Sequence, residues 1–289
     1  RIVGDAVLDL PGVAETVTGR ILSLPIDRAP QLNVPLLRSG RFPAPNATDE
    51  VVVNEPFAEA NGFVPGDTFF ANLNGQKRAL TITGTALSPE YIYQIAPGAM
   101  FPDYQRYGVL WMARKPLATA YDMDGAFNDV SMTIIKGTHV ETLLDRLDNL
   151  LEPYGGIGAI ARKDQLSHRF LSEELKQQRT IATVFPVIFF GVAAFLLNVV
   201  ISRLVSLERE QIAVLKAFGY SDLSVGLHYA KLVIMIVALG IVGGVVLGIQ
   251  FGQGLSHLYM AFYSLPFMIY VLKPQVIIAA ALISMTVAI

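Results

Sequence analysis

The chain has 289 residues, of which 53% are hydrophobic, and a formal net charge of −2. The hydrophobic share exceeds that of ordinary soluble domains, and the lack of a basic block argues against a nucleic-acid partner. The absence of cysteine excludes disulfides and thiolate metal sites.

The charged residues are unevenly distributed. Up to Arg179 there are 17 basic and 21 acidic residues, whereas from Thr180 onward there are 5 basic and 3 acidic ones. We therefore predict a polar domain followed by a membrane domain. Because Pro274–Ile289 has 16 residues where about 20 cross a bilayer, we expect the complete protein to continue this span and to have another before Arg1.

Residues 1–163 have the pattern of a mixed α+β domain. Asn54 is predicted to cap a helix over Phe57–Ala60, which Gly62 ends. The dipeptide Asn74–Gly75 favours two positive-φ positions and predicts a β-hairpin. Val13–Leu24 contains strand-like residues, and further strands are expected at Asp49–Asn54, Thr68–Leu73, Arg78–Thr83 and Gly108–Met112.

A β-α-β unit is predicted at the end of this domain. Val130–Lys136 and Ile157–Ala161 are strand-like, and Thr138–Leu151 between them has apolar residues at helical spacing. Residues 164–179 then form a predicted stalk helix. Neither proline nor glycine separates this stalk from the membrane span, so we expect a stiff rod.

Transmembrane helices are predicted at 180–202 and 228–256, and a further one begins at 274–289. Pro186 is expected to kink the first span. The Arg203–Lys231 connection, which includes the segment at 203–227, contains four basic residues, Arg203, Arg209, Lys216 and Lys231. The Ser256–Lys273 connection, which includes the loop at 257–273, contains only Lys273. Because basic short loops stay in the cytoplasm, the large N-terminal domain is predicted to be extracytoplasmic.

The cytoplasmic connection carries an amphipathic helix. Leu204, Leu207, Val214 and Phe218 share one side, and Gly219 is a predicted stop. Two interpretations are open: a helical connecting loop, or a helix that inserts into a groove of a partner.

Small residues recur at every fourth position of the next helix, at Gly240, Gly244, Gly248, Gly252 and Ser256. Such a face allows close helix packing. It could be a static contact or a surface that slides during transport, and the two are compatible.

No catalytic or cofactor motif is found. The histidines at 139, 168, 228 and 257 lack metal-ligand spacing, and there is no nucleophile elbow or metalloprotease helix. The chain also lacks a phosphate-binding loop, so it is predicted not to be an enzyme and to bind no cofactor itself.

The segment EREQIAVLKAFGYS, residues 208–221, resembles the connection between the second and third helices of FtsX-like and MacB-like ABC transporter permeases. Leu37–Asp67 is similar to the MacB-like periplasmic core. The resemblance implies a bacterial, multi-pass inner-membrane permease of the type VII class. It also implies a coupling helix whose ATPase contacts are Glu208, Arg209, Glu210, Gln211, Ile212, Leu215, Lys216, Phe218 and Gly219.

The implied partners are a dimer of ABC ATPase subunits, which would bind ATP and magnesium on the cytoplasmic side, and a second permease half or copy. Membrane lipid and an extracytoplasmic protein are further partners. The expected function is export or extraction of a hydrophobic or amphipathic substrate such as a lipid, lipoprotein or peptide. The alternative is mechanotransmission that activates an extracytoplasmic partner, such as a cell-wall hydrolase, without transport. A membrane-bound enzyme is a third, disfavoured hypothesis.

Overall fold

The computed structural model describes residues 1–25 and 30–288, and the chain divides into two compact units. The first unit comprises Arg1–Glu173 and Met260–Phe267, and the second comprises Glu174–Tyr259 and Met268–Ile289. Each is described by itself below.

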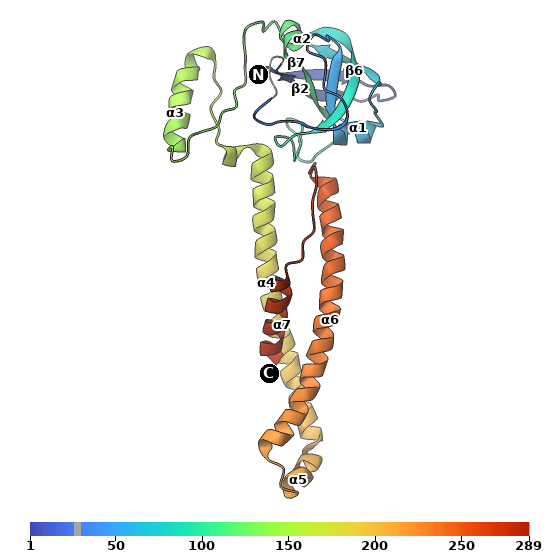
Figure 1. Ribbon diagram of the computed structural model, residues 1–289, viewed down its shortest axis with the longest axis vertical. Helices are drawn as coiled ribbons and strands as arrows, with labels where there is room; N and C mark the ends of the chain where they lie inside the picture. The colour runs from blue at the N-terminus through green and yellow to red at the C-terminus, as the bar shows by residue number, and fades with distance from the viewer. Residues whose placement is uncertain (26–29, 289) are drawn as a thin grey trace. The chain divides into compact units, whose positions relative to one another are not determined.

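The first unit is built on a seven-stranded mixed sheet (Figure 1). Its strands are β1 (Val3–Asp9), β2 (Val17–Leu24), β3 (Leu36–Gly40), β4 (Glu50–Asn54), β5 (Thr68–Leu73), β6 (Gln76–Leu87) and β7 (Tyr107–Ala113). Their order is β3-β6-β4-β7-β2-β1-β5, and β5 also pairs with β6. This last pairing closes six strands into a barrel-like ring, with β3 as an extra strand on β6.

Two short helices cover the apolar interior of this ring. Phe57 in α1 (Glu55–Asn61) and Leu117 in α2 (Arg114–Ala120) are both fully buried in the largest hydrophobic cluster. The predicted hairpin is confirmed, since Asn74 and Gly75 have φ of +50° and +83° between β5 and β6. Gly62 ends α1 in the left-handed conformation, as predicted.

The predicted role of Asn54 as a helix cap is only half right. Asn54 occupies the N-cap position of α1, but its side chain makes no capping hydrogen bond. Its Oδ1 instead accepts from the backbone N–H of Val109, at 2.7 Å, and its Nδ2 donates to Gln94. The neighbouring pairs of β4 and β7 end at Val53 and Leu110, so the Asn54 side chain adds one bond between these strands.

The predicted β-α-β unit is wrong in its two strands. The helix is present as α3 (Val140–Leu151), but Val130–Lys136 and Ile157–Ala161 form no strand. A strand requires a hydrogen-bonded neighbour, and none of the described strands pairs with either segment. α3 also has no fully buried residue, and most of the apolar residues at its predicted helical spacing are only half-buried.

The short 3₁₀ helices η1 (Glu152–Tyr154) and η2 (Arg162–Asp164) lead to α4 (Leu166–Leu207). The predicted stalk and first span are parts of this one 42-residue helix, which passes through Pro186 without interruption. Its first turns belong to the first unit and the rest to the second.

All the regular secondary structure of the second unit is helical within the described residues. Besides α4 it contains α5 (Arg209–Ala217), α6 (Asp222–Phe262) and α7 (Pro274–Ala288). α6 extends beyond the span predicted at 228–256 in both directions. Among the described helices, α4 and α6 are long and apolar enough to cross a membrane, by length and composition.

Candidate functional site

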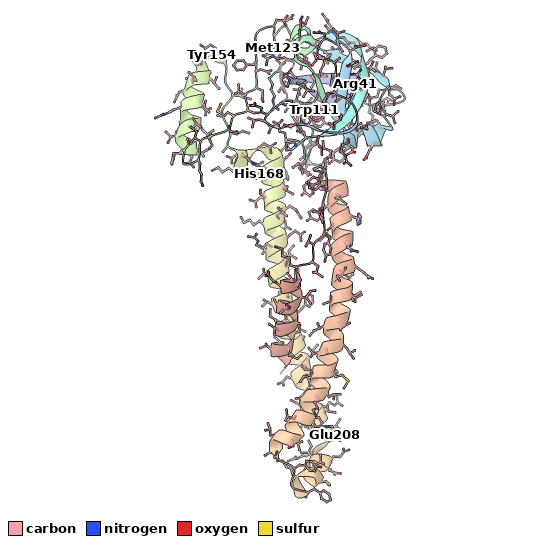
Figure 2. All side chains as sticks on the ribbon, in the orientation of Figure 1. Arg41, Trp111, Met123, Tyr154, His168 and Glu208 are labelled. Atoms are coloured by element: carbon pink, nitrogen blue, oxygen red, sulfur yellow. The ribbon has the colours of Figure 1, made fainter. Side chains whose placement is uncertain are left out.

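The turn between α4 and α6 is formed by α5 and its caps. α4 ends at Leu207, and Glu208 occupies the N-cap position of α5; Figure 2 shows Glu208 at this turn. Gly219 has φ of +88°, and its N–H donates to the carbonyl of Lys216 at 3.0 Å. The predicted glycine stop is therefore confirmed.

Ser221 begins the return into α6. Its Oγ accepts a hydrogen bond from the backbone N–H of Ser224, at 3.2 Å, as expected of a residue that caps a helix. Local contacts of Gly219 and Ser221 thus close the turn where α5 leads into α6, whereas Glu208 at the start of α5 makes no side-chain capping hydrogen bond.

The apolar side chains of this turn lack a cover within the described chain. No residue of α5 is buried. Phe218 is 79% exposed, and the other exposed apolar residues are Leu207, Val214, Leu215, Tyr220 and Leu223, while Ile212 is half-buried. An open depression beside them is lined by Ser206, Leu207, Arg209, Glu210 and Ala213. Such a mixture of exposed apolar and charged residues is typical of a surface that binds another protein.

The charged residues of the turn lie at both ends of α5. Glu208, Arg209 and Glu210 are at its start, followed by the uncharged Gln211, and Lys216 near its end forms an ion pair with Asp222 of α6. Both partners of this pair are more than half exposed, so it contributes little stability. A partner that offered Lys216 another carboxylate would therefore compete with only a weak contact.

The predicted glycine face of α6 divides into two parts. Gly240, Gly244 and Gly248 line an apolar groove of about 680 Å³, and nothing lies within 4 Å of the position of an added Cβ. The other walls come from α4, with Ala193 and Ala194 among them, and from α7. In the described chain, these three glycines thus face open space rather than a packed helix.

Gly252 differs from the other three. A Cβ there would lie 2.5 Å from the ring of Tyr270, so this glycine makes room for the segment that precedes α7. Ser256 Oγ donates to the carbonyl of Gly252 within the same helix, at 2.9 Å. Of the four glycines on this face, Gly252 is therefore the one against which another part of the described chain packs closely.

A polar contact that the sequence did not suggest joins α4 to α6. The Tyr259 hydroxyl donates to the carboxylate of Glu174, and Gln178 Nε2 donates to the Tyr259 oxygen at 2.6 Å. Gln178 also donates to Glu174, at 3.2 Å. These three side chains link the two long helices near the start of the predicted span at 180–202.

A second unpredicted feature is the segment Ser88–Gln94, which follows β6. The ring of Tyr93 contacts Phe170 of α4, with centroids 4.5 Å apart, and Tyr263 beyond the end of α6, at 5.7 Å. In the sequence, this segment is marked by the start of a run of 12 uncharged residues, Tyr91–Pro102, in which Tyr91 and Tyr93 are the two tyrosines. The contacts join residues far apart in the chain, which is why the pattern alone did not reveal them.

No group of three or more His, Asp or Glu side chains that could hold a metal ion occurs among the residues that the structure describes.

Comparison with known families bears on the helical part. Residues 183–289 match the family model of the FtsX-like permease C-terminal domain. The match supports the FtsX-like permease family. It includes α5, α6 and α7, and the whole glycine face.

Members of this family are membrane-embedded, are generally non-catalytic transporter subunits and normally work with an ABC ATPase. A search of curated proteins finds no match to the chain. The family match does not extend to the sheet of the first unit, whose likeness to the MacB-type core remains a prediction.

Proposed function

We propose that the chain is the permease subunit of a type VII, MacB-FtsX-like ABC transporter. It couples ATP hydrolysis by a partner subunit to a conformational change of the extracytoplasmic domain, and so to export or extraction of a hydrophobic or amphipathic substrate. The observation that carries this proposal is that the exposed α5 turn lies within the residues that match the FtsX-like permease family.

In this proposal, α5 is the helix that an ABC ATPase dimer holds on the cytoplasmic side. Phe218, Leu215 and Val214 supply apolar anchors, and Arg209 and Lys216 supply charge. Interface energy concentrates in a few large side chains that become buried, so Phe218 is the principal anchor. A second permease half or copy would complete the membrane part.

The alternative, mechanotransmission to an extracytoplasmic partner, has its own support. The start of α4 and the end of α6 both contact the segment after β6 in the sheet unit, an arrangement that suits the passing of movement to that unit. The two functions share the same coupling step and differ only in what the moving domain acts on.

The first test is ATPase stimulation in the assembled complex. Phe218→Ala should weaken binding of the ATPase by on the order of 30-fold, since an anchor of about 2 kcal/mol is removed. Phe251→Ala is the matched control, because Phe251 is 76% exposed on α6 in the middle of the apolar helix. Unchanged stimulation by the Phe218 variant would refute the role of α5.

The orientation is tested separately. The chain has no cysteine, so single cysteines at Lys216 and at Tyr154 can be labelled selectively in intact cells. We expect an impermeant reagent to label position 154 and not position 216. Labelling of position 216 from outside would place α5 on the wrong side of the membrane.

A further inference from the structure

The segment Ser88–Gln94, here called the joint segment, lies between the end of β6 and the loop that leads to β7. It has no regular secondary structure, yet Ser88, Tyr93 and Gln94 are buried. Irregular backbone is usually found on the surface, because its polar groups need partners. The partners of this segment come from three directions.

The first partner is the beginning of α4. Ser167, which is 1% exposed, places its Oγ 2.7 Å from the carbonyl oxygen of Glu90 and 3.0 Å from that of Tyr93. The same Oγ accepts from the N–H of Tyr93, at 3.3 Å, and Gln165 Nε2 donates to the Glu90 carbonyl at 2.8 Å. A single buried hydroxyl thus holds the backbone of the joint segment at two residues.

The second partner is the end of α6 and the residues that follow it. The N–H of Ser264 donates to the carbonyl of Ile92, at 2.9 Å. The Tyr93 ring contacts both Phe262 and Tyr263, with centroids 5.7 Å apart in each case. Both long helices therefore meet the same few residues of the sheet unit.

The third partner is the sheet itself. Gln94 Nε2 donates to the carbonyl of Tyr107 at the start of β7, at 2.7 Å, and Gln94 Oε1 accepts from Asn54 at the end of β4, at 2.9 Å. Asn54 in turn accepts from Val109 in β7. Hydrogen bonds thus join α4 to Tyr93, and the next residue of the chain, Gln94, is hydrogen-bonded to two neighbouring strands.

From these contacts, we propose that the joint segment receives the movement of α4 and α6 and passes it to β4 and β7, with Ser167 and Tyr93 as its positioning residues. The inference rests on the proposed function, which supplies the movement. Packed interiors respond to displacement as units rather than by gradual deformation, so a segment whose buried residues are hydrogen-bonded to α4 and to the sheet transmits movement where a flexible loop would absorb it.

A natural reporter lies beside the joint segment. Trp111 is the only tryptophan of the chain and is 2% exposed in β7. Its ring meets that of Tyr91 edge-on, with centroids 6.4 Å apart. Figure 2 shows Trp111 within the sheet unit. Movement of the joint segment should change the environment of this indole.

The experiment uses the full chain labelled with 5-fluorotryptophan, assembled with an unlabelled ABC ATPase and followed by ¹⁹F NMR. Trapping the complex with ATP and vanadate should shift the single resonance of Trp111. Ser167→Ala combined with Tyr93→Leu should lose most of this shift while ATPase stimulation persists, because α5 is untouched. Ser172→Ala with Tyr154→Leu, two exposed positions of the same unit, is the control that keeps the shift.

The outcomes separate the two proposals. A shift of wild-type size in the Ser167/Tyr93 variant, or no shift in the wild type despite stimulated ATPase activity, overturns the role of the joint segment. An absence of stimulation by the wild-type chain would refute the proposed function instead. Should Tyr93→Leu disturb folding, Ser167→Ala alone, which removes only a hydroxyl, must still reduce the shift.

Discussion

The pair Asn54 and Gln94 offers a direct energetic test of the hydrogen bonds that join Gln94 to the sheet. Both side chains are 3% exposed or less. Replacing Asn54 by leucine leaves the N–H of Val109 and the Oε1 of Gln94 without their partner. Replacing Gln94 by leucine likewise leaves the carbonyl of Tyr107 and the Nδ2 of Asn54 without a hydrogen-bond partner.

The expected cost follows from counting these groups. A buried polar group that loses its partner costs about 1–3 kcal/mol, so each single variant should lose about 2–6 kcal/mol of unfolding free energy. The double variant leaves only Val109 N–H and the Tyr107 carbonyl unpaired, the same number as either single variant. Its cost should therefore resemble that of one substitution, with a coupling energy of at least about 2 kcal/mol.

The measurement is equilibrium unfolding of the full chain in detergent, followed by Trp111 fluorescence, which reports on the sheet unit because it is the only indole. Asn149→Leu, on exposed α3, is the control and should change the unfolding free energy by less than about 0.5 kcal/mol. Costs that simply add in the double variant would refute the linked arrangement of Asn54 and Gln94.

Three further predictions concern stability, the first of them measured by the same Trp111 unfolding assay. Gly40→Ala should destabilise the sheet unit by at least about 2 kcal/mol, because φ is +72° and the new Cβ would lie 2.1 Å from the Thr83 carbonyl oxygen. Gly12→Ala is the control: φ is +80° but the space around it is open, so this variant should cost about 1 kcal/mol. Hydrogen bonds from Arg41 and from the N–H of Ala44 lower the pKa of Glu50 to about 2, so its contribution is present above pH 4.5 and is lost as the pH falls toward 2. Glu50→Gln should therefore flatten the fall in melting temperature over this range, and an unchanged fall would contradict the assignment. Gly252→Val should destabilise the helical unit by about 1–3 kcal/mol, because the ring of Tyr270 must move to make room for the new side chain. Gly244→Val, where the space is open, should be tolerated. Unfolding is followed by loss of helical circular dichroism, and equal effects of the two variants would contradict the packing of Tyr270 on Gly252.

Local signals in the sequence predicted the local elements of the fold. The Asn74–Gly75 hairpin, the Gly62 and Gly219 stops and the strand at Gly108–Met112 each depend on neighbouring residues, and each is present. The closure of the ring by β5 and β6, in contrast, depends on pairings that no local pattern encodes.

The failed strands show the limit of alternation as a signal. Ile135 and Ile157, in the two segments predicted as strands, are 84% and 104% exposed. The pattern describes residues that suit a sheet, but a strand forms only where a neighbour supplies hydrogen bonds. No described strand pairs with either segment.

The same distinction separates the predicted and the missed parts of the site. The α5 turn is contiguous, so its charged and apolar residues could be identified from residues 203–227 alone. The contacts of the joint segment, by contrast, join residues near 92, 167 and 263, and they are made by a serine hydroxyl and backbone groups. These groups carry no periodic or charged signal in the sequence.

The arrangement of contacts along α4 and α6 bears on how the proposed coupling could work. Each helix has more than 40 residues and is therefore about 60 Å long, and the two are connected at one end through α5. Within the helical unit, the Glu174–Tyr259 contact links them again, while Gly240, Gly244 and Gly248 face an open groove. The hydrogen bonds at residues 174 and 259 join the two helices there, whereas the three glycines contact no neighbouring helix, so we expect force applied at α5 to reach residues 174 and 259 as a movement of the helix pair. Tyr259→Phe removes the hydroxyl that joins them and should reduce the vanadate-induced shift of Trp111 without lowering ATPase stimulation. A full shift in that variant would show that each helix acts on the sheet unit independently.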